Sequence, residues 1–332
     1  MRVPRQIVLA SRPSGWPVAA NFAVTEVPSA DLADGQVRVR NLFMSVDPYM
    51  RGRMDDAKSY IPPFQVGEPL EGGAVGEVTE TKSPDLAVGD LVLHQLGWRD
   101  EAVLPGRHAQ RVESIPGLSP SAYLGVLGMP ALTAYVGLLD IAGLKSGDVV
   151  FVSGAAGAVG SMAGQFAKLL GASRVIGSAG TDEKVRWLRE IGYDAAFSYK
   201  HGPVHEQLRE AAPDGIDVYF DNVGDDHLEA ALSALRQNGR VALCGAIANY
   251  NATEPRGPRN LGLAISKRLT LRGYIILDHG SRLPDMVADV TGWLRDGKLQ
   301  HAETVMDGLN RAPDAFLAML SGGNTGKMIV RL

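Results

Sequence analysis

Hydrophobic and polar positions follow two different patterns along the chain. From Met1 to about Pro120, short apolar alternations such as "QVRVRNLF" and "DLVLHQL" are interrupted by turn sequences such as "PSG", "GEP" and "VGD". This pattern predicts short strands in an antiparallel barrel. From Ser121 onward, runs of β-forming residues alternate with longer helical patterns, which predicts βαβ units and a parallel sheet. The change of pattern indicates a domain boundary near "SPSAYLGVLGMPALTAY".

The second pattern predicts a doubly wound parallel sheet, so the expected fold class is α/β. We expect a helix around 284–296, after which the tail from His301 returns to strand, helix and strand. Its final strand is expected to rejoin the first domain. The sheet itself is predicted from six apolar runs at 149–153, 174–178, 194–198, 216–220, 240–244 and 269–276.

Length and charge narrow the classes of function. The chain has 332 residues, which favours two domains over one. The hydrophobic share of 45% and the charged share of 21% are those of an ordinary globular protein. A net charge of −4 provides no basic surface for nucleic acid or an anionic membrane, so we expect a small-molecule partner.

Cys244 is the only cysteine. A disulfide within the chain and a zinc site made of several thiolates are therefore excluded. The sequence contains no apolar run long enough to span a membrane, and its first residues do not resemble a signal peptide. We expect the protein to reside in the cytoplasm.

The stretch "VSGAAGAVGSMAGQFAKLLGASRVIGSAGTDEK" predicts a dinucleotide-binding unit. A buried-strand pattern precedes it, and apolar residues within 159–170 recur at helical spacing until Gly171. Gly157 and Gly160 match the last two glycines of the G-x-G-x-x-G fingerprint, but Ala155 occupies the position of the first. An ordinary strand-to-helix turn is the alternative. The spacing of strand, helix and next strand favours dinucleotide binding.

The end of the second strand favours NADP over NAD. An NAD site usually has an acidic residue there for the ribose hydroxyls, and "SAGT" offers none. Lys184, one turn into the next helix, supplies a cation for a 2′-phosphate, although a solvated helix lysine is the alternative reading. Asp182 and Glu183 lie in the first helical turn, where the helix dipole favours acids.

The chain resembles the medium-chain dehydrogenase/reductase superfamily in its zinc-free branch of prostaglandin reductases and alkenal or enone double-bond reductases. The resemblance covers nearly the whole length, through "NLFMSVDPYMRGRM", "GMPALTAY", "GAAGAVGS", "AGTDEK", "FDNVG", "CGAIANYN" and "GGNTGK". It implies a GroES-like β-barrel catalytic domain at 1–122, completed by about 303–332. It also implies a Rossmann NADP-binding domain at 123–302 and a homodimer.

The resemblance implies NADPH as the cofactor and a set of positions that contact it. The positions implied to contact the pyrophosphate are Ala158, Val159, Gly160 and Ser161, which follow Gly157 of the turn. The positions implied to contact the 2′-phosphate are Lys184 and Tyr199. Positions along the rest of the cofactor are Asn222, Cys244, Gly245, Ala246, Ile247, Tyr250, Ile275, Ile276, Leu277 and Asn324.

The zinc-dependent relatives have a Gly-His-Glu segment and a lobe with four cysteines, whereas this chain has "VGEPLEGGAVGEV". No metal site is therefore expected. Hydride delivery to the β-carbon of a conjugated ketone or aldehyde places charge on the carbonyl oxygen, where one hydrogen-bond donor gives sufficient help. Tyr250 is the candidate donor, together with a ribose hydroxyl of the cofactor, because an unperturbed phenol keeps its proton until about pH 10. Its alternative role is packing against the cofactor.

Tyr49 of "SVDPYMR" matches a position that lines the substrate cleft in the family, and its alternative role is a barrel-turn tyrosine. Asp47 and Arg51 are expected to be structural partners. The expected activity is NADPH-dependent reduction of the carbon–carbon double bond of α,β-unsaturated ketones and aldehydes. A zinc-free quinone reductase and a noncatalytic NADPH-binding protein are the alternatives.

Overall fold

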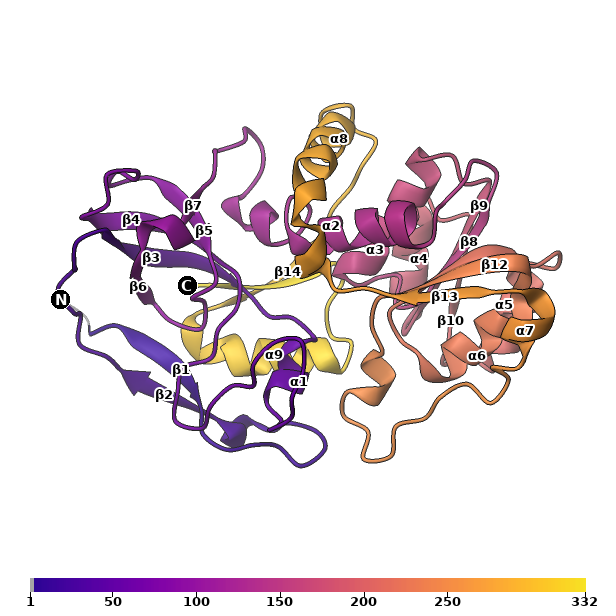
Figure 1. Ribbon diagram of the computed structural model, residues 1–332, viewed down its shortest axis with the longest axis horizontal. Coiled ribbons are helices and arrows are strands. Elements are labelled where there is room, and N and C mark those ends of the chain that lie inside the picture. The colour runs from indigo at the N-terminus through magenta and orange to yellow at the C-terminus, as the bar shows by residue number, and fades with distance from the viewer. Residues whose placement is uncertain (1–2) are drawn as a thin grey trace. The chain divides into compact units, whose positions relative to one another are not determined.

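The chain forms two compact units in the computed structural model, which describes residues 3–332 (Figure 1). The first unit comprises Met1–Leu124 together with Glu303–Leu332. The second unit is the continuous segment Gly125–Ala302. Each unit has its own sheet and its own core.

The first unit is built on a seven-stranded sheet with the order β14-β15-β3-β4-β5-β7, in which β6 also pairs with β3. A two-stranded sheet, β1-β2, accompanies it. Two helices of this unit are α1 (Met50–Arg53) and α9 (Ala312–Leu320). The strands are β1 (Arg5–Leu9), β2 (Phe22–Glu26), β3 (Gln36–Ser45), β4 (Ala74–Thr81), β5 (Leu91–His94), β6 (Glu101–Pro105), β7 (Gln110–Arg111), β14 (Glu303–Asp307) and β15 (Lys327–Arg331).

The predicted return of the tail to the first unit is confirmed, because β15 pairs antiparallel with β3. The strands before Pro120 pair antiparallel with one another, as predicted. In the tail, β14 and β15 are parallel. The helix α9 lies between these two strands in sequence, and a helical crossover returns the chain in the same direction.

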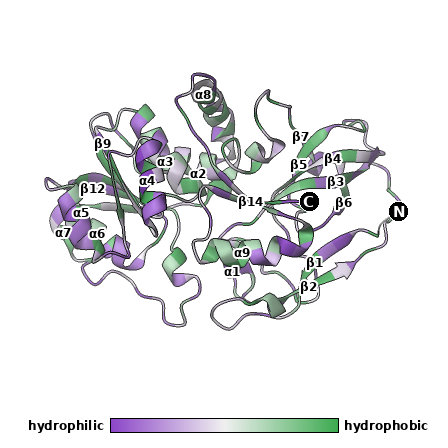
Figure 2. Cartoon of the chain, turned by 180° about the vertical axis from the view of Figure 1, so that it is seen from behind, coloured by the Kyte–Doolittle hydropathy of each residue, from purple (hydrophilic) through white to green (hydrophobic). Residues whose placement is uncertain are grey.

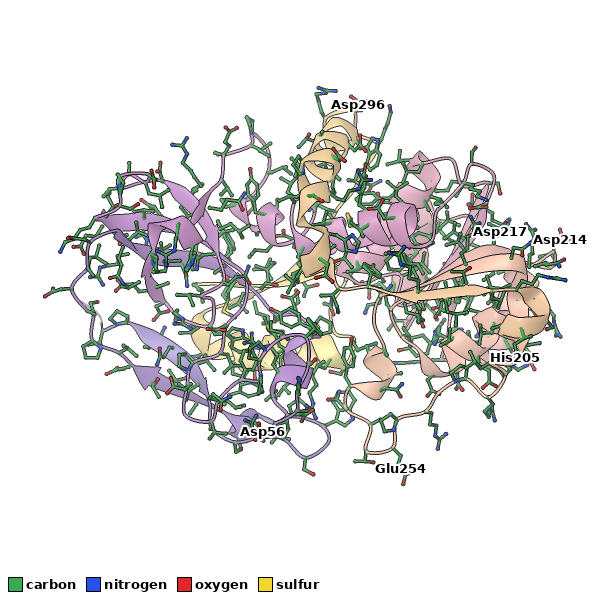
Figure 3. The ribbon with its side chains drawn as sticks, in the orientation of Figure 1. Asp56, His205, Asp214, Asp217, Glu254 and Asp296 are labelled. Atoms are coloured by element: carbon green, nitrogen blue, oxygen red, sulfur yellow. The ribbon has the colours of Figure 1, made fainter. Side chains whose placement is uncertain are left out.

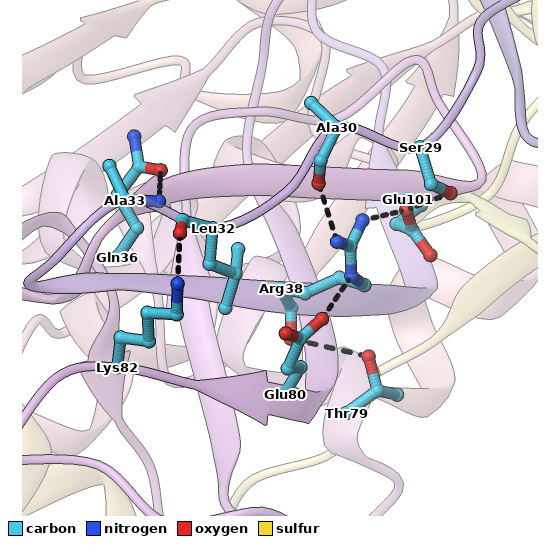
Figure 4. A network of polar contacts seen from close by, with 10 residues as sticks. All are labelled: Ser29, Ala30, Leu32, Ala33, Gln36, Arg38, Thr79, Glu80, Lys82 and Glu101. Carbon is cyan, nitrogen blue, oxygen red and sulfur yellow. Dashed lines mark hydrogen bonds and ion pairs between the residues drawn. The ribbon is translucent and has the colours of Figure 1, made fainter.

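Cross-strand ion pairs fix the register of β3. Arg38 is in the middle of the strand, and its guanidinium bonds to Glu80 of β4 at 3.0 Å and to Glu101 of β6 at 2.7 Å (Figure 4). The same group donates to the main-chain oxygen of Ala30 at 2.6 Å. A slip of one residue would move Arg38 to the other face of the sheet and break all three contacts.

The core of the first unit packs around Trp98, which is fully buried. Phe22 stacks on it with ring centroids 6.0 Å apart, and Phe316 of α9 meets it edge-on at 6.1 Å. The helix α9 is mostly hydrophobic, whereas α4 of the second unit is mostly hydrophilic (Figure 2). The tail therefore contributes to the core of the first unit as well as to its sheet.

The second unit has a six-stranded parallel sheet with the order β10-β9-β8-β11-β12-β13. This is the 3-2-1-4-5-6 order of a doubly wound dinucleotide-binding fold, so the predicted α/β fold class is confirmed. The strands are β8 (Val149–Val152), β9 (Arg174–Ala179), β10 (Ala195–Ser198), β11 (Ile216–Asp221), β12 (Leu235–Leu243) and β13 (Thr270–Gly273). The helices are α2 (Met129–Val136), α3 (Ala158–Leu169), α4 (Asp182–Glu190), α5 (Val204–Ala211), α6 (Asp225–Ala234), α7 (Leu263–Lys267) and α8 (Leu283–Arg295).

All six predicted strands and the helix near 284–296 are present, with differences at their ends. The strand β12 begins at Leu235, five positions before the predicted start. The strand β13 ends at Gly273, and a 3-10 helix follows at Ile276–Arg282. Ile275 and Ile276, which the predicted strand 269–276 includes, therefore lie beyond β13.

Candidate functional site

The glycine turn follows β8, at the centre of the parallel sheet. The backbone of Gly154 is left-handed, with φ +57°, and α3 begins at Ala158. A Cβ at Gly160 would lie 2.4 Å from the main-chain oxygen of Gly154, so only glycine fits there. In the fingerprint, Ala155 occupies the position of the first glycine. The structure places the left-handed turn one residue earlier, at Gly154.

The turn leads into a helix end that is suited to an anion. Gly157 is the N-cap of α3 and has no side chain to accept hydrogen bonds from the first-turn N–H groups. Ser161 is buried, and its hydroxyl donates to the main-chain oxygen of Ala158 at 3.3 Å. The strand order reverses between β8 and β11, the switch point at which open α/β sheets bind dinucleotides. The backbone here fits a pyrophosphate.

The end of β9 leads through Thr181 into α4, the helix that contains Lys184. Thr181 caps α4, accepting a hydrogen bond from the main-chain N–H of Lys184 at 3.3 Å. Burial, followed by the charge of Lys200, lowers the pKa of the Lys184 ammonium. The carboxylate of Asp182 lies 3.3 Å from Nε2 of His201. The structure therefore brings Lys184 into a partly desolvated, cationic setting.

Tyr199 lies beside this strand end. A Cβ at Gly180 would come within 2.9 Å of the Tyr199 hydroxyl, so the phenol rests against a glycine. The main-chain N–H of Tyr199 donates to the oxygen of Ala179 at 3.1 Å. His227 of α6 meets the Tyr199 ring edge-on, with centroids 5.4 Å apart. These contacts place Tyr199 at the same strand end as the Lys184 helix.

A buried carboxylate organises the switch point. Oδ1 of Asp221, the last residue of β11, accepts hydrogen bonds from Tyr219 Oη at 2.7 Å and Ser153 Oγ at 3.2 Å. The main-chain N–H groups of Val223 and Gly224 donate to the same oxygen at 2.9 and 2.8 Å. Burial raises the pKa of Asp221, and these hydrogen bonds oppose the rise. The adjacent Asn222 donates from Nδ2 to the oxygen of Ser153 at 2.8 Å.

The loop after β12 carries the predicted nicotinamide-side residues. The main-chain N–H groups of Cys244 and Gly245 donate to the oxygen of Asp221 at 2.9 and 3.0 Å. The hydroxyl oxygen of Tyr250 accepts from the N–H of Ala246 at 3.4 Å, across the short helix Ile247–Asn249. That contact uses a lone pair of the phenol and not its proton. Burial raises the pKa of the Cys244 thiol to about 12, which makes it a poor nucleophile.

Tyr49 is the predicted pocket residue in the first unit. It is the N-cap residue of α1 and packs against the core, and burial raises the pKa of its phenol. Asp47, two positions earlier, pairs with Lys327 of β15 at 2.8 Å. Arg51, the expected partner of Asp47, forms an ion pair with Asp55 at 2.8 Å. Spacing suggested a local pair, but β15 brings in a cation from 280 positions away.

The remaining predicted contacts are distributed between the two units. Asn324 belongs to the first unit, in the loop before β15, and donates from Nδ2 to the oxygen of Gly326 at 2.7 Å. Leu277 belongs to the second unit and is 67% exposed. Sequence reasoning missed Gly154, Asp221 and Lys327, although Gly154 stands directly beside the fingerprint.

A groove between α5 and α6 is separate from the candidate cofactor-binding residues at the carboxyl ends of the parallel strands. Charged residues line it, among them His205, Asp214, Glu229 and Arg259, and His205 and Asp214 are visible at the surface (Figure 3). Arg259 and Glu229 form an ion pair with each other at 2.7 Å.

Within residues 3–332, no three His, Cys, Asp or Glu side chains are grouped as metal ligands. No helix in that same range is both long and apolar enough to cross a membrane.

The parallel sheet, its switch point and the glycine turn define a dinucleotide-binding protein. Residues 5–112 match the family model described as the N-terminal domain of oxidoreductase, and residues 158–292 match that of zinc-binding dehydrogenase. The NADPH-dependent curcumin reductase of Escherichia coli (strain K12) is 42% identical over 99% of this chain and 96% of its own. Prostaglandin reductase 1 of Bos taurus is 41% identical over 96% and 95%.

Solved structures agree with these sequence relatives. CurA of Vibrio vulnificus, in complex with NADPH, is 44% identical, with a TM-score of 0.94 and 98% of both chains covered. A quinone oxidoreductase of Escherichia coli has a TM-score of 0.80 at 20% identity, which indicates a shared fold. The chain belongs to the medium-chain dehydrogenase/reductase superfamily, in the zinc-free branch of prostaglandin and enone reductases. It is an NADP-dependent oxidoreductase, so the predicted enzyme class and cofactor are confirmed.

Proposed function

We propose that the enzyme reduces the carbon–carbon double bond of α,β-unsaturated ketones and aldehydes with NADPH. The main structural support is the Tyr250 hydroxyl, which the N–H of Ala246 holds at 3.4 Å beyond the carboxyl end of β12. The glycine turn follows the carboxyl end of β8 in the same parallel sheet. The names of the curcumin and prostaglandin reductases support the same class of substrate.

The second unit is proposed to hold the cofactor. The N-terminus of α3, after Gly157, binds the pyrophosphate, and Lys184 and Tyr199 bind the 2′-phosphate. The other contacts proposed are Ala158, Val159, Gly160, Ser161, Asn222, Cys244, Gly245, Ala246, Ile247, Tyr250, Ile275, Ile276, Leu277 and, from the first unit, Asn324. When bound, NADPH supplies the hydride that is added to the β-carbon of the substrate.

Tyr250 is proposed to act on the substrate oxygen. As the β-carbon is reduced, negative charge develops on the carbonyl oxygen, and the phenol O–H donates a hydrogen bond to it. The Ala246 N–H restrains the phenol oxygen before substrate arrives, so little ordering is needed during the reaction. In this scheme Tyr250 donates the hydrogen bond and Tyr49 lines the pocket, and no metal is required.

Tyr49 is proposed to line the substrate pocket. Burial raises the pKa of its phenol, so the group remains protonated and can donate throughout the neutral range. Its place at the start of α1, next to the buried Asp47–Lys327 pair, gives it a fixed backbone. We expect Tyr49 to orient substrate and Tyr250 to stabilise charge.

The substrate class can be tested with steady-state assays of NADPH oxidation on an enone, an enal and a quinone. We expect the enone and enal to be preferred. A quinone preferred by about two orders of magnitude in kcat/KM would instead assign a quinone reductase. Tight NADPH binding without turnover of any substrate would assign a noncatalytic binding protein.

The role of Tyr250 can be tested with Tyr250→Phe. Loss of one donor of this kind costs about 1–3 kcal/mol, so kcat/KM for the enone should fall about tenfold or more. Tyr123→Phe is the control, because the Tyr123 hydroxyl donates to the main-chain oxygen of Glu113. An unchanged kcat/KM in Tyr250→Phe would reduce Tyr250 to a packing residue.

A cytoplasmic homodimer is proposed on the family resemblance. The strand β13 is an edge of the parallel sheet and is largely exposed. Leu261, just before α7, is 53% exposed, and Ile265, within α7, is 85% exposed. Exposed apolar side chains of this kind suit a contact between two copies. Sedimentation of the purified protein measures the assembly, and a monomer at micromolar concentration would contradict it.

A further inference from the structure

We propose that Lys200 is a second specificity residue for NADPH, which forms with Lys184 a two-lysine site for the dianionic 2′-phosphate. The proposal rests on the proposed cofactor site and adds a residue that the fingerprint did not indicate. Lys200 lies after β10, whereas Lys184 lies in α4 after β9. Their meeting depends on the pairing of these two strands.

The pairing of β9 and β10 brings both segments to one edge of the sheet. The strands are parallel, and Ser198 at the end of β10 is in register with Ala179 at the end of β9. The hydrogen bond from the Tyr199 N–H to the Ala179 oxygen, 3.1 Å long, extends this pairing beyond the strands. Lys200 is the next residue, and its N–H donates to Ser198 Oγ at 3.4 Å.

The two ammonium groups are close enough to repel each other. The charge of Lys200 contributes, after burial, to the lowered pKa of Lys184. Repulsion between two cations is unfavourable in the protein alone, and an anion that binds both of them offsets it. The 2′-phosphate is the group that NADPH has and NADH lacks.

Two acids, Asp182 and Glu183, lie in the first turn of α4 near these cations. Asp182 faces His201, with its carboxylate 3.3 Å from Nε2. Glu183 acts in the opposite sense to Lys200 and raises the pKa of Lys184. Two lysines and a histidine thus meet two carboxylates, and Tyr199 completes the edge with a hydroxyl that rests against Gly180.

Equilibrium binding tests the proposal without enzyme turnover. The variants are Lys200→Ala, Lys184→Ala, Lys200→Arg and, as a matched surface control, Lys298→Ala, which removes an exposed lysine paired with Asp296 at 3.2 Å. The probes are NADPH and NADH, together with adenosine 2′,5′-bisphosphate and AMP as fragments. Calorimetry or nucleotide fluorescence gives each dissociation constant at low and high salt.

We expect Lys200→Ala to weaken binding of NADPH and the bisphosphate by about threefold to tenfold, with NADH and AMP changed less than twofold. Lys184→Ala should have the larger effect, Lys200→Arg should keep the preference, and Lys298→Ala should change neither nucleotide. Lys200→Ala should also reduce the salt dependence of NADPH binding. Equal losses for phosphorylated and unphosphorylated probes, or no loss for either, would overturn the role of Lys200. Because these probes need no substrate, failure of the enone assay would leave this result intact.

Discussion

Each unit of the molecule buries one aspartate beside its candidate site, and the two are stabilised in different ways. Asp47 of the first unit is paired with the ammonium of Lys327 at 2.8 Å, and Ser45 also donates to it. Asp221 of the second unit accepts only neutral donors, from two hydroxyls and two main-chain N–H groups. The first carboxylate depends on a full counter-charge, and the second depends on dipoles.

The difference follows from what each aspartate holds in place. The Asp47–Lys327 pair joins the end of β3 to the start of β15, so it links the N-terminal segment to the tail. Asp221 holds only its local turn and the neighbouring β8, next to a helix end suited to an anion. Four neutral donors are sufficient for this local role.

Replacing the buried aspartate by asparagine should therefore reduce the free energy of unfolding most in the first unit. Asp47→Asn leaves the buried ammonium of Lys327 without its counter-charge, so we expect the free energy of unfolding to fall by about 3–5 kcal/mol. The urea midpoint of the isolated variant measures this loss. The double variant Asp47→Asn with Lys327→Met should recover most of it, since the unpaired charge is then gone. A single variant as stable as the wild type would show that the pair contributes nothing.

The pH dependence of stability should depend on two buried histidines, His94 in the first unit and His227 in the second. Burial lowers the pKa of His94 and of His227 to about 4. His94 has both ring nitrogens bonded, to Asn41 at 2.9 Å and Leu96 at 3.1 Å, whereas Nε2 of His227 has no hydrogen-bond partner among residues 3–332.

Because each folded pKa lies below that of the unfolded chain, the unfolded state takes up protons first. The free energy of unfolding should therefore decrease as the pH falls from about 6.5 to 4, by about 3 kcal/mol for each histidine. Asp221 acts in the opposite direction, since its raised pKa favours the folded state at low pH. Unfolding titrations at each pH check this, and His227→Phe should remove one histidine's share. A flat profile in this range would contradict the assignment.

The smallest effect is expected from Asp221→Asn. All four donors converge on Oδ1, and an asparagine keeps an acceptor oxygen there, so the loss should be about 1 kcal/mol. The urea midpoint of this variant can be compared directly with that of Asp47→Asn. If the two variants lost equal stability, the distinction between counter-charge and neutral donors would fail. NADPH affinity in Asp221→Asn then reports whether the switch-point loop has kept its geometry.

The second unit was predictable from sequence because its determinants are local. Continuous apolar runs predict all six strands of the parallel sheet, helical spacing predicts helices between them, and Gly171 marks the end of α3. The residues at the end of the second strand already favoured NADP and indicated Lys184, and the family resemblance added the positions Tyr199 and Tyr250. The sequence did not reveal that the left-handed turn falls at Gly154, since a fingerprint fixes spacing and not backbone dihedral angles.

The first unit was less predictable because its key contacts connect distant segments. Nothing in the "SVDPYMR" motif indicates that Asp47 pairs with Lys327 rather than with Arg51, because the partner is supplied by strand pairing. The parallel step between β14 and β15 has the same origin. Lys200 also required the structure, since its proximity to Lys184 comes from the register of β9 and β10.

The antiparallel pairing of β15 with β3 also has a consequence for the order of events on the ribosome. The second unit is one continuous segment and can complete its sheet as soon as residue 302 has emerged. The first unit is begun earlier but must wait, because Asp47 meets its lysine only after another 280 residues have been translated. Until β15 is made, the edge of β3 that it covers has no strand partner there and the Asp47 carboxylate has no ion pair with Lys327.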